Sequence, residues 1–314
     1  MAFTRWIPAL VAFALLATGL VAVARAAEPK TPSATEAALI AGAIDIHVHS
    51  YPDDRPRSID AIDVARLAEK RGMRAIVMKN HYESTAALAE IVHKIVPGVQ
   101  VFGGVVLNRP QGGINPAAVE HMAQLTGHLG RVVWMPTFDS ENGLKFTKES
   151  RPAVPVTRDD AVLPEVREVI GLIAKHDLVL ATGHIAPAES LLVLAEARRQ
   201  KVRHMVVTHA LFMPVFMTIP QMKQAAALGA YLEFAGGNPG GRGGPERMAQ
   251  FAEAIRAVGV EHCILSTDLG QPNNPLPPDG MAQLLVALQQ QGFSKAELDM
   301  MAKENPARLL GLQN

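Results

Sequence analysis

Cysteine is nearly absent from the 314-residue chain, which contains only Cys263. A disulfide framework needs pairs of cysteines, and structural zinc sites of the finger type need at least two thiolates. The composition therefore excludes both, and any metal that this chain binds must be held mainly by nitrogen and oxygen ligands.

Excess charge of one sign and aromatic side chains are also scarce. Lys and Arg number 30 and Asp and Glu number 30, so no net positive charge attracts a phosphate backbone, and we expect no nucleic-acid partner. Aromatic residues make up 5% of the chain, which leaves few stacking surfaces for large planar ligands. Hydrophobic residues make up 48%, which excludes a disordered chain and indicates a folded protein.

The chain begins with a segment typical of an export signal. Arg5 precedes an apolar run over residues 7–24, and Ala24 and Ala26 provide the small residues of a cleavage site. We therefore expect residues 1–26 to be a cleavable signal peptide of a periplasmic or secreted protein with no stable membrane association afterwards. An uncleaved membrane anchor is the less favoured alternative, because the run is at the lower limit of a membrane span.

From residue 43 onward, short apolar runs alternate with stretches of helical period. The runs are rich in Val and Ile and nearly continuous in apolarity, as parallel strands covered on both faces are. They recur about every 31 residues, the size of one strand–helix–strand step. The pattern predicts a single-domain α/β protein, a (β/α)8 TIM barrel over residues 43–314 after an N-terminal extension at 27–42. A doubly wound open sheet is the alternative. The predicted strands are residues 43–50, 75–82, 99–108, 131–139, 178–185, 204–210, 230–236 and 263–270.

Two connections are unusual for a barrel. Residues 140–164 are long and charged, which indicates an insertion or lid rather than a second domain. Residues 236–244 are rich in glycine, and the sequence leaves open whether they form a flexible connector or an anion-binding loop.

Metal-ligating residues gather at the predicted strand ends. His47 and His49 lie two residues apart on the first strand, so their imidazoles point to the same side. His184 and His209 end the fifth and sixth strands, and Asp268 ends the eighth. Active sites of TIM barrels lie at the C-terminal ends of the strands, so we expect these donors on one rim. Imidazole and carboxylate ligands suit a divalent metal, zinc first, with manganese or iron as alternatives.

Four further residues are candidates for the same rim. Lys79 and His81 end the second strand on one face. Lys79 has three interpretations: a carbamate that bridges two metal ions, an ammonium that binds an anionic substrate, or a strand cap. We expect His81, Asn108 near the third strand end and Arg242 in the glycine-rich loop to contact substrate.

These residues resemble the amidohydrolase superfamily of metal-dependent hydrolases. The matching motifs are D-x-H-x-H at residues 45–49 and S-T-D at 266–268, together with His184 and His209. The C-terminal residues 304–312 are similar to the family's N-P-A-x-L-L-G-L. The resemblance extends from about residue 43 to residue 312, nearly the whole barrel, and is greatest to an uncharacterised amidohydrolase-like branch. The motifs of that branch are M-K-N-H at 78–81, V-L-N at 106–108 and W-M-P-T at 134–137.

The resemblance implies a ligand set. His47, His49 and Asp268 would bind one metal ion, while His184 and His209 would bind a second or, in one-metal members, contact the substrate. The chain departs from the family at the fourth strand, which ends without the lysine or glutamate that bridges two ions. The number of metal ions, one or two, therefore stays open.

The resemblance also implies hydrolysis of an amide, ester, lactone or phosphoester bond in a small molecule by a metal-activated water. Asp268 would transfer the proton, and His209 or Lys79 would stabilise charge on the substrate oxygen. Two alternatives are a mononuclear decarboxylase or hydratase of the same superfamily and an exported barrel that binds a metal or ligand without catalysis. The sequence does not decide the bond that is cleaved or whether the chain forms a homo-oligomer.

Overall fold

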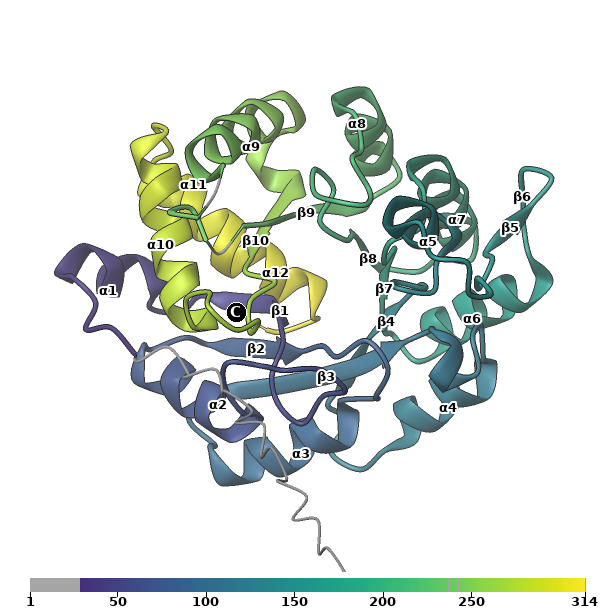
Figure 1. The fold of residues 1–314 in the computed structure, drawn as a ribbon, viewed down its shortest axis with the longest axis horizontal. Helices are drawn as coiled ribbons and strands as arrows, with labels where there is room; N and C mark the ends of the chain where they lie inside the picture. The colour runs from purple at the N-terminus through teal and green to yellow at the C-terminus, as the bar shows by residue number, and fades with distance from the viewer. Residues whose placement is uncertain (1–28, 237, 242, 314) are drawn as a thin grey trace, which may run out of the picture.

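Eight parallel strands form a barrel in the computed structural model, which describes residues 29–236, 238–241 and 243–313 (Figure 1). The two edges of the sheet meet where Val48 bridges Leu269, and the backbone N–H of His49 donates to the Leu269 carbonyl at 2.8 Å. The predicted TIM barrel is therefore confirmed, and the doubly wound alternative is wrong, because such a sheet keeps two open edges. In the order of pairing, which is also chain order, the strands are β1 (Ile44–Val48), β2 (Ala75–Met78), β3 (Gln100–Val106), β4 (Gly130–Trp134), β7 (Val179–Ala181), β8 (His204–Val207), β9 (Tyr231–Ala235) and β10 (Cys263–Ser266).

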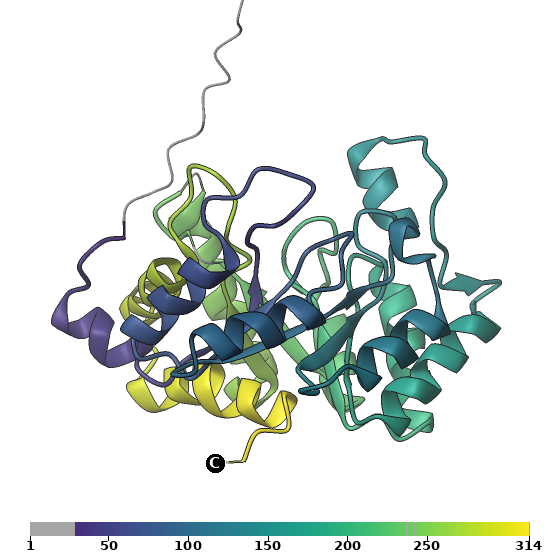
Figure 2. The same ribbon diagram turned by 90° about the horizontal axis from the view of Figure 1, so that it is seen from below.

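Helices cover the outside of the barrel (Figures 1 and 2). In α6, for example, Val166, Val169, Ile170 and Ile173 are fully buried, and their spacing places them on one helical face against the strands. Pro164 occupies the first turn of that helix, where its missing N–H costs nothing. The surrounding helices are α2 (Ala61–Lys70), α3 (Ala86–Ile95), α4 (Pro116–Gln124), α6 (Pro164–Lys175), α7 (Pro187–Arg199), α8 (Ile219–Ala227), α9 (Gly244–Val258) and α10 (Pro277–Gln290).

Smaller elements complete the fold. The connection after β4 contains α5 and a two-stranded hairpin, β5 and β6, of which β6 contacts α7. Helix α1 lies in the predicted N-terminal extension and packs on α10. The bounds of these and the remaining elements are α1 (Ala34–Ile40), α5 (Glu141–Thr147), β5 (Thr157–Arg158), β6 (Ala161–Val162), α11 (Lys295–Asp299), α12 (Asn305–Leu309), 3₁₀ turns at Arg109–Gln111 and Val260–His262, and a π turn at Met300–Glu304.

Two sequence predictions lie outside the described residues, namely the signal peptide at 1–26 and the substrate contact of Arg242. Both stay predictions. Within the part of the chain that the structure describes, no helix is both long and apolar enough to cross a membrane.

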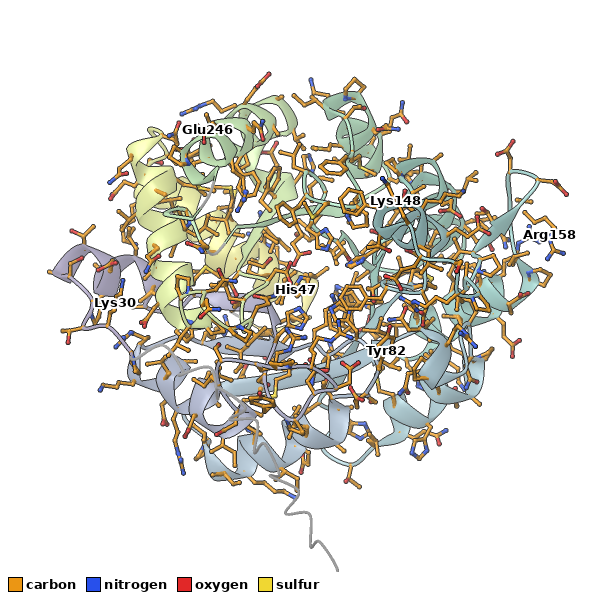
Figure 3. The ribbon with its side chains drawn as sticks, in the orientation of Figure 1. Lys30, His47, Tyr82, Lys148, Arg158 and Glu246 are labelled. Carbon is orange, nitrogen blue, oxygen red and sulfur yellow. The ribbon has the colours of Figure 1, made fainter. Side chains whose placement is uncertain are left out.

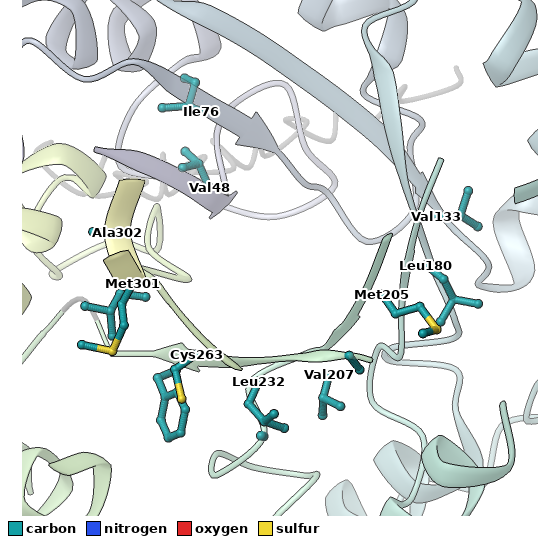
Figure 4. Close-up of a cluster of buried hydrophobic side chains, with 14 of the residues drawn as sticks. Val48, Ile76, Val133, Leu180, Met205, Val207, Leu232, Cys263, Met301 and Ala302 are labelled. Carbon is teal, nitrogen blue, oxygen red and sulfur yellow. The ribbon is translucent and has the colours of Figure 1, made fainter. Parts of the chain in front are cut away.

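The apolar core has two layers, separated by the sheet. Figure 4 shows the outer layer, in which side chains such as Ile76, Leu180 and Leu232 point away from the barrel towards the helices. The inner layer takes alternate residues of the strands, such as Val77 and Ile264, and is completed by residues from the C-terminal segment that includes α12. This inner layer fills the N-terminal end of the barrel.

Polar residues replace this inner layer at the C-terminal end. Lys79 follows Val77 by two residues, and Ser266 follows Ile264 by two. Because strand side chains alternate between faces, each polar residue continues the inward row of its apolar predecessor. The strands themselves therefore place ionisable groups at one mouth of the barrel.

Candidate metal centre

Five histidines meet at the C-terminal mouth of the barrel, where Figure 3 shows His47 near the middle of the view. Their imidazoles are neighbours all the way round: ring centroids are 5.2 Å apart for His47–His49, 5.1 Å for His49–His81, 5.9 Å for His81–His184, 4.8 Å for His184–His209 and 5.9 Å for His209–His47. All five side chains are buried. We refer to these residues as the histidine cluster, and it unites every histidine that the sequence placed at a strand end.

Three predicted ligands converge within the cluster. The Asp268 Oδ1 atom lies 2.9 Å from His49 Nε2 and 3.1 Å from His47 Nε2. These three donor atoms lie within 4.8 Å of one another, close enough to bind one metal ion. Burial acts to raise the pKa of Asp268, but His47 and His49 hold it well below its usual value. The side chain is therefore an ionised carboxylate, suited to a divalent cation.

Asp45, the first residue of the D-x-H-x-H motif, holds the loop that carries Asp268. Its carboxylate accepts hydrogen bonds from the hydroxyl of Thr267 at 2.6 Å and from the backbone N–H of Thr267 at 3.1 Å. Asp268 itself has a left-handed backbone, with φ at 53°. This conformation is strained for a residue with a side chain, so the neighbouring contacts have to maintain it.

Glu233 orients His47. The Nδ1–H of His47 donates to Glu233 Oε1 at 3.0 Å, so Nε2 is the atom that loses its proton when a metal binds. Glu233 also accepts from the Ser266 hydroxyl at 2.7 Å and from the His209 backbone N–H at 2.8 Å. Burial acts to raise the pKa of Glu233, but His47 and these hydrogen bonds lower it to about 2. A carboxylate behind a ligating imidazole is a common support of metal sites.

Glu233 was not among the predicted site residues, because it lies inside β9 and not at a strand end. A signal was present, since Glu233 is the only charged residue of the run Y-L-E-F-A. A carboxylate in a buried strand is costly unless it has a partner.

Lys79 lies inside the site. Its Nζ is 3.0 Å from His47 Nε2, and its side chain is one of the largest that are fully buried. Burial lowers the pKa of Lys79 to about 8, although Asp268 and Glu233 act to raise it. This position favours a role in the site over strand capping. Carboxylation of Lys79 stays a prediction.

His47 and His49 differ in their protonation states. Burial and Lys79 act to lower the pKa of His47, but Asp268 and Glu233 raise it to about 9. His49 is neutral, because burial lowers its pKa to about 3. Its Nδ1 lies 3.1 Å from Arg57 Nη2, and arginine can only donate, so His49 carries its proton on Nε2 facing Asp268. A metal bound to either Nε2 must therefore replace a proton.

His184 and His209 form a second pair. Their Nε2 atoms are 3.1 Å apart, so one nitrogen must donate and the other accept, or a cation must lie between them. Burial lowers the pKa of both, that of His209 to about 4, so both are neutral. The Nδ1 atom of His209 is buried and has no hydrogen-bond partner within the described structure. The pair suits either alternative that the resemblance leaves open, a second metal ion or a substrate contact.

His81 and Asn108 have different positions although both were predicted to contact substrate. The ring of His81 stacks on Phe138 at 3.7 Å, and its Nδ1 pairs with the Thr137 hydroxyl at 2.9 Å. The Asn108 amide donates to the His81 carbonyl and the Thr137 hydroxyl, and accepts from the backbone N–H groups of Thr137 and Asp139. These bonds occupy the whole side chain, so Asn108 positions the residues around His81 and has no polar atom left for a substrate.

The fold is shared with solved structures of low sequence identity. An amidohydrolase from Pseudomonas aeruginosa has 14% identity and a TM-score of 0.61, covering 88% of this chain and 98% of its own. An amidohydrolase from Burkholderia multivorans with bound zinc has 15% identity and a TM-score of 0.60, covering 87% and 100%. An organophosphorus hydrolase from Deinococcus radiodurans has 16% identity and a TM-score of 0.57, covering 88% and 94%. These similarities confirm the expected TIM-barrel fold.

A comparison with curated proteins finds no match. The model of one protein family, described as a family of unknown function (DUF6282), matches residues 42–233. That range contains the histidine cluster, Lys79 and Glu233, and it ends before Asp268. Because the match covers more than half of the chain, the protein belongs to the DUF6282 family.

Proposed function

We propose that the protein is a metal-dependent hydrolase that uses a water activated at a divalent metal ion, zinc first, to cleave an amide, ester, lactone or phosphoester bond in a small molecule. The convergence of His47 Nε2, His49 Nε2 and Asp268 Oδ1 on one point carries the proposal. The donor set fits the metal, since it combines two imidazoles with an ionised carboxylate and a second carboxylate behind His47.

The metal would supply a water of lowered pKa and an electrophile for the substrate oxygen. Asp268 is the residue that moves the proton. Its side chain is 25% exposed, against 1% for both His47 and His49, so it contacts both the ligands and the open mouth. As an ionised carboxylate it accepts a proton from the attacking water and then donates it to the leaving group.

Other residues hold the substrate. Lys79, when protonated, places a positive charge beside His47, where it stabilises negative charge that develops on a substrate oxygen. His209 and His184 are neutral, and an Nε2–H of this pair donates a hydrogen bond to the same oxygen. The names of the similar structures, an amidohydrolase with bound zinc and an organophosphorus hydrolase, support both the metal and the class of reaction.

Removal and return of metal test the proposal. We expect chelation to abolish hydrolysis over a panel of esters, lactones, amides and phosphoesters, and zinc to restore it. Full hydrolytic activity of metal-free protein would contradict the proposal. Release of carbon dioxide from a carboxylated substrate would instead favour the decarboxylase alternative, and metal binding without any turnover would favour the binding barrel.

We also propose that the protein is exported to the periplasm or beyond, because residues 1–26 have the pattern of a signal peptide. N-terminal sequencing of the protein from the exported fraction should give Ala27 as the first residue. A protein that stays in the cytoplasm and keeps Met1 would contradict export.

A further inference from the structure

A cavity of about 300 Å³ opens beside Asp268, between the ends of β9 and β10. Ligand pockets range from about 300 to 1,000 Å³, so this one suits a small molecule. Its wall includes Phe212, Arg247, Asn238, Gln271 and Asn274 in addition to Asp268. The cavity therefore joins the proton-transferring carboxylate to a set of hydrogen-bonding side chains that the proposed chemistry does not use.

Among the described residues that line this wall, Arg247 is the cation, and it differs from Arg55 and Arg57 near the mouth. Arg55 and Arg57 are each paired with a neighbouring carboxylate, Asp54 at 2.7 Å and Asp53 at 2.5 Å. Among the described residues, no carboxylate lies within 4.0 Å of the Arg247 guanidinium. The positive charge of Arg247 is therefore available to a ligand.

Phe212 contacts this guanidinium. The centre of the guanidinium lies 5.0 Å from the centroid of the Phe212 ring, within the range of a cation–π contact. Stacking leaves the N–H edge of an arginine free to bind a carboxylate or phosphate with two parallel hydrogen bonds. A contact with Phe212 is therefore compatible with the binding of an oxyanion by Arg247 in this cavity.

Two further features make this end of the cavity favourable for an anion. Helix α9 begins at Gly244, three residues after Gly241, which lines the cavity, and the N-terminus of a helix carries partial positive charge. Asn238 and Asn274 provide amide groups and are hydrogen-bonded to each other at 2.8 Å. Of the wall residues that the structure describes, Asp268 alone is acidic.

We infer that the substrate of the proposed hydrolase carries a carboxylate or phosphate group, which Arg247 binds in this cavity while the bond to be cleaved lies at Asp268. The inference rests on the proposed function and adds the chemical class of the substrate. It also assigns Arg247, rather than Arg55 or Arg57, as the residue that selects it.

Matched substrates test the inference. Each pair consists of an ester or lactone that carries a free carboxylate and an analogue in which a neutral primary amide replaces that carboxylate. In a second series, a phosphate takes the place of the free carboxylate. The zinc-loaded protein should prefer the anionic member of a pair. Arg247→Gln should raise KM for that member roughly 10- to 100-fold, because a charge-assisted hydrogen-bond pair is lost, with little change for the neutral member.

Arg256→Gln is the matched control. Arg256 lies on the same helix and stacks on Phe293 at 4.6 Å, but it donates to the Gln291 carbonyl and does not line the cavity. This variant should keep wild-type KM for both members. Arg247→Lys keeps the charge but loses the planar guanidinium. This variant should therefore keep only part of the wild-type preference for the anionic substrate.

A binding measurement separates this inference from the proposed function. Glutarate and inorganic phosphate are titrated calorimetrically into metal-free protein, in which they cannot bind a metal, with neutral glutaramide as the comparison. Binding of either anion that Arg247→Gln weakens and Arg256→Gln preserves supports the inference, and the stronger anion identifies the group. Metal-dependent hydrolysis without any preference for anions, or with Arg247→Gln unchanged, overturns the inference and leaves the proposed function standing. Absence of metal-dependent hydrolysis overturns the proposed function instead.

Discussion

The two halves of the histidine cluster differ in what supports their imidazoles. The carboxylate of Glu233 supports His47 from behind, at Nδ1. The Nε2 atoms of His47 and His49 both face the carboxylate of Asp268. His184 and His209 have no such support, since their Nε2 atoms face each other and Nδ1 of His209 has no partner in the described structure. The first half contains negative charge that a cation can neutralise, whereas the second is a neutral pair. The difference indicates that the tighter metal site is formed by His47, His49 and Asp268.

The largest expected effect concerns proton transfer. Asp268→Asn should lower kcat roughly 10²- to 10⁴-fold, because the amide cannot accept a proton from water. Metal content should fall much less, since the amide oxygen remains a weak ligand. His184→Gln in the other half is the comparison and should lower kcat less. Equal losses in the two variants would remove the distinction between the halves.

The next effect concerns the support of His47. Glu233→Gln should weaken metal binding roughly 10- to 100-fold, the usual cost of losing a partner of a ligating histidine. Titration with zinc against a competing chelator measures it. Glu253→Gln, a change at an exposed position of α9, serves as control and should leave affinity unchanged. Unchanged affinity in Glu233→Gln would mean that the carboxylate does not support a ligand.

A smaller effect depends on pH. With a pKa of about 9, His47 is protonated at neutral pH in the metal-free protein and must lose its proton to bind a metal. Zinc affinity should therefore rise with pH and level off near pH 9. The stability of the metal-free protein changes with pH in the opposite direction. The contribution of charged His47 to the free energy of unfolding is fully present below pH 6.5 and is lost as pH rises towards 9. Thermal unfolding of metal-free protein across this range checks the second expectation, and a flat profile would contradict it.

The smallest effect on the site concerns Asn108. Asn108→Ala should lower the free energy of unfolding by about 1–3 kcal/mol, because it leaves buried hydrogen-bonding groups without partners. Zinc content should not change, since the residue positions the segments around His81 and binds no metal. Chemical denaturation measures the loss. A loss of zinc without a loss of stability would contradict this account and assign Asn108 a role in the metal site.

Much of the fold was predictable because parallel strands covered on both faces leave a strong apolar pattern. The strand ends also located His47, His49, His184, His209 and Asp268, since the barrel brings its C-terminal ends together by construction.

What the sequence could not supply were contacts between segments distant in the chain. Glu233 is 186 residues from His47, and its role depends on the pairing of the two side chains across the barrel. Arg57 lies in a loop, and nothing in its local sequence indicates that it donates to His49. Asn108 has a side chain of the type that binds substrates. Only the hydrogen bonds around Thr137 show that the donors and acceptors of its amide are already occupied.

Zinc content per chain tests the central claim most directly. The wild-type protein, loaded with zinc and dialysed against metal-free buffer, should keep at least one ion per chain, and His47→Gln treated in the same way should keep none at that site. Retention of the full zinc content by His47→Gln, or a wild-type protein that keeps no divalent metal, would contradict a metal centre at His47, His49 and Asp268.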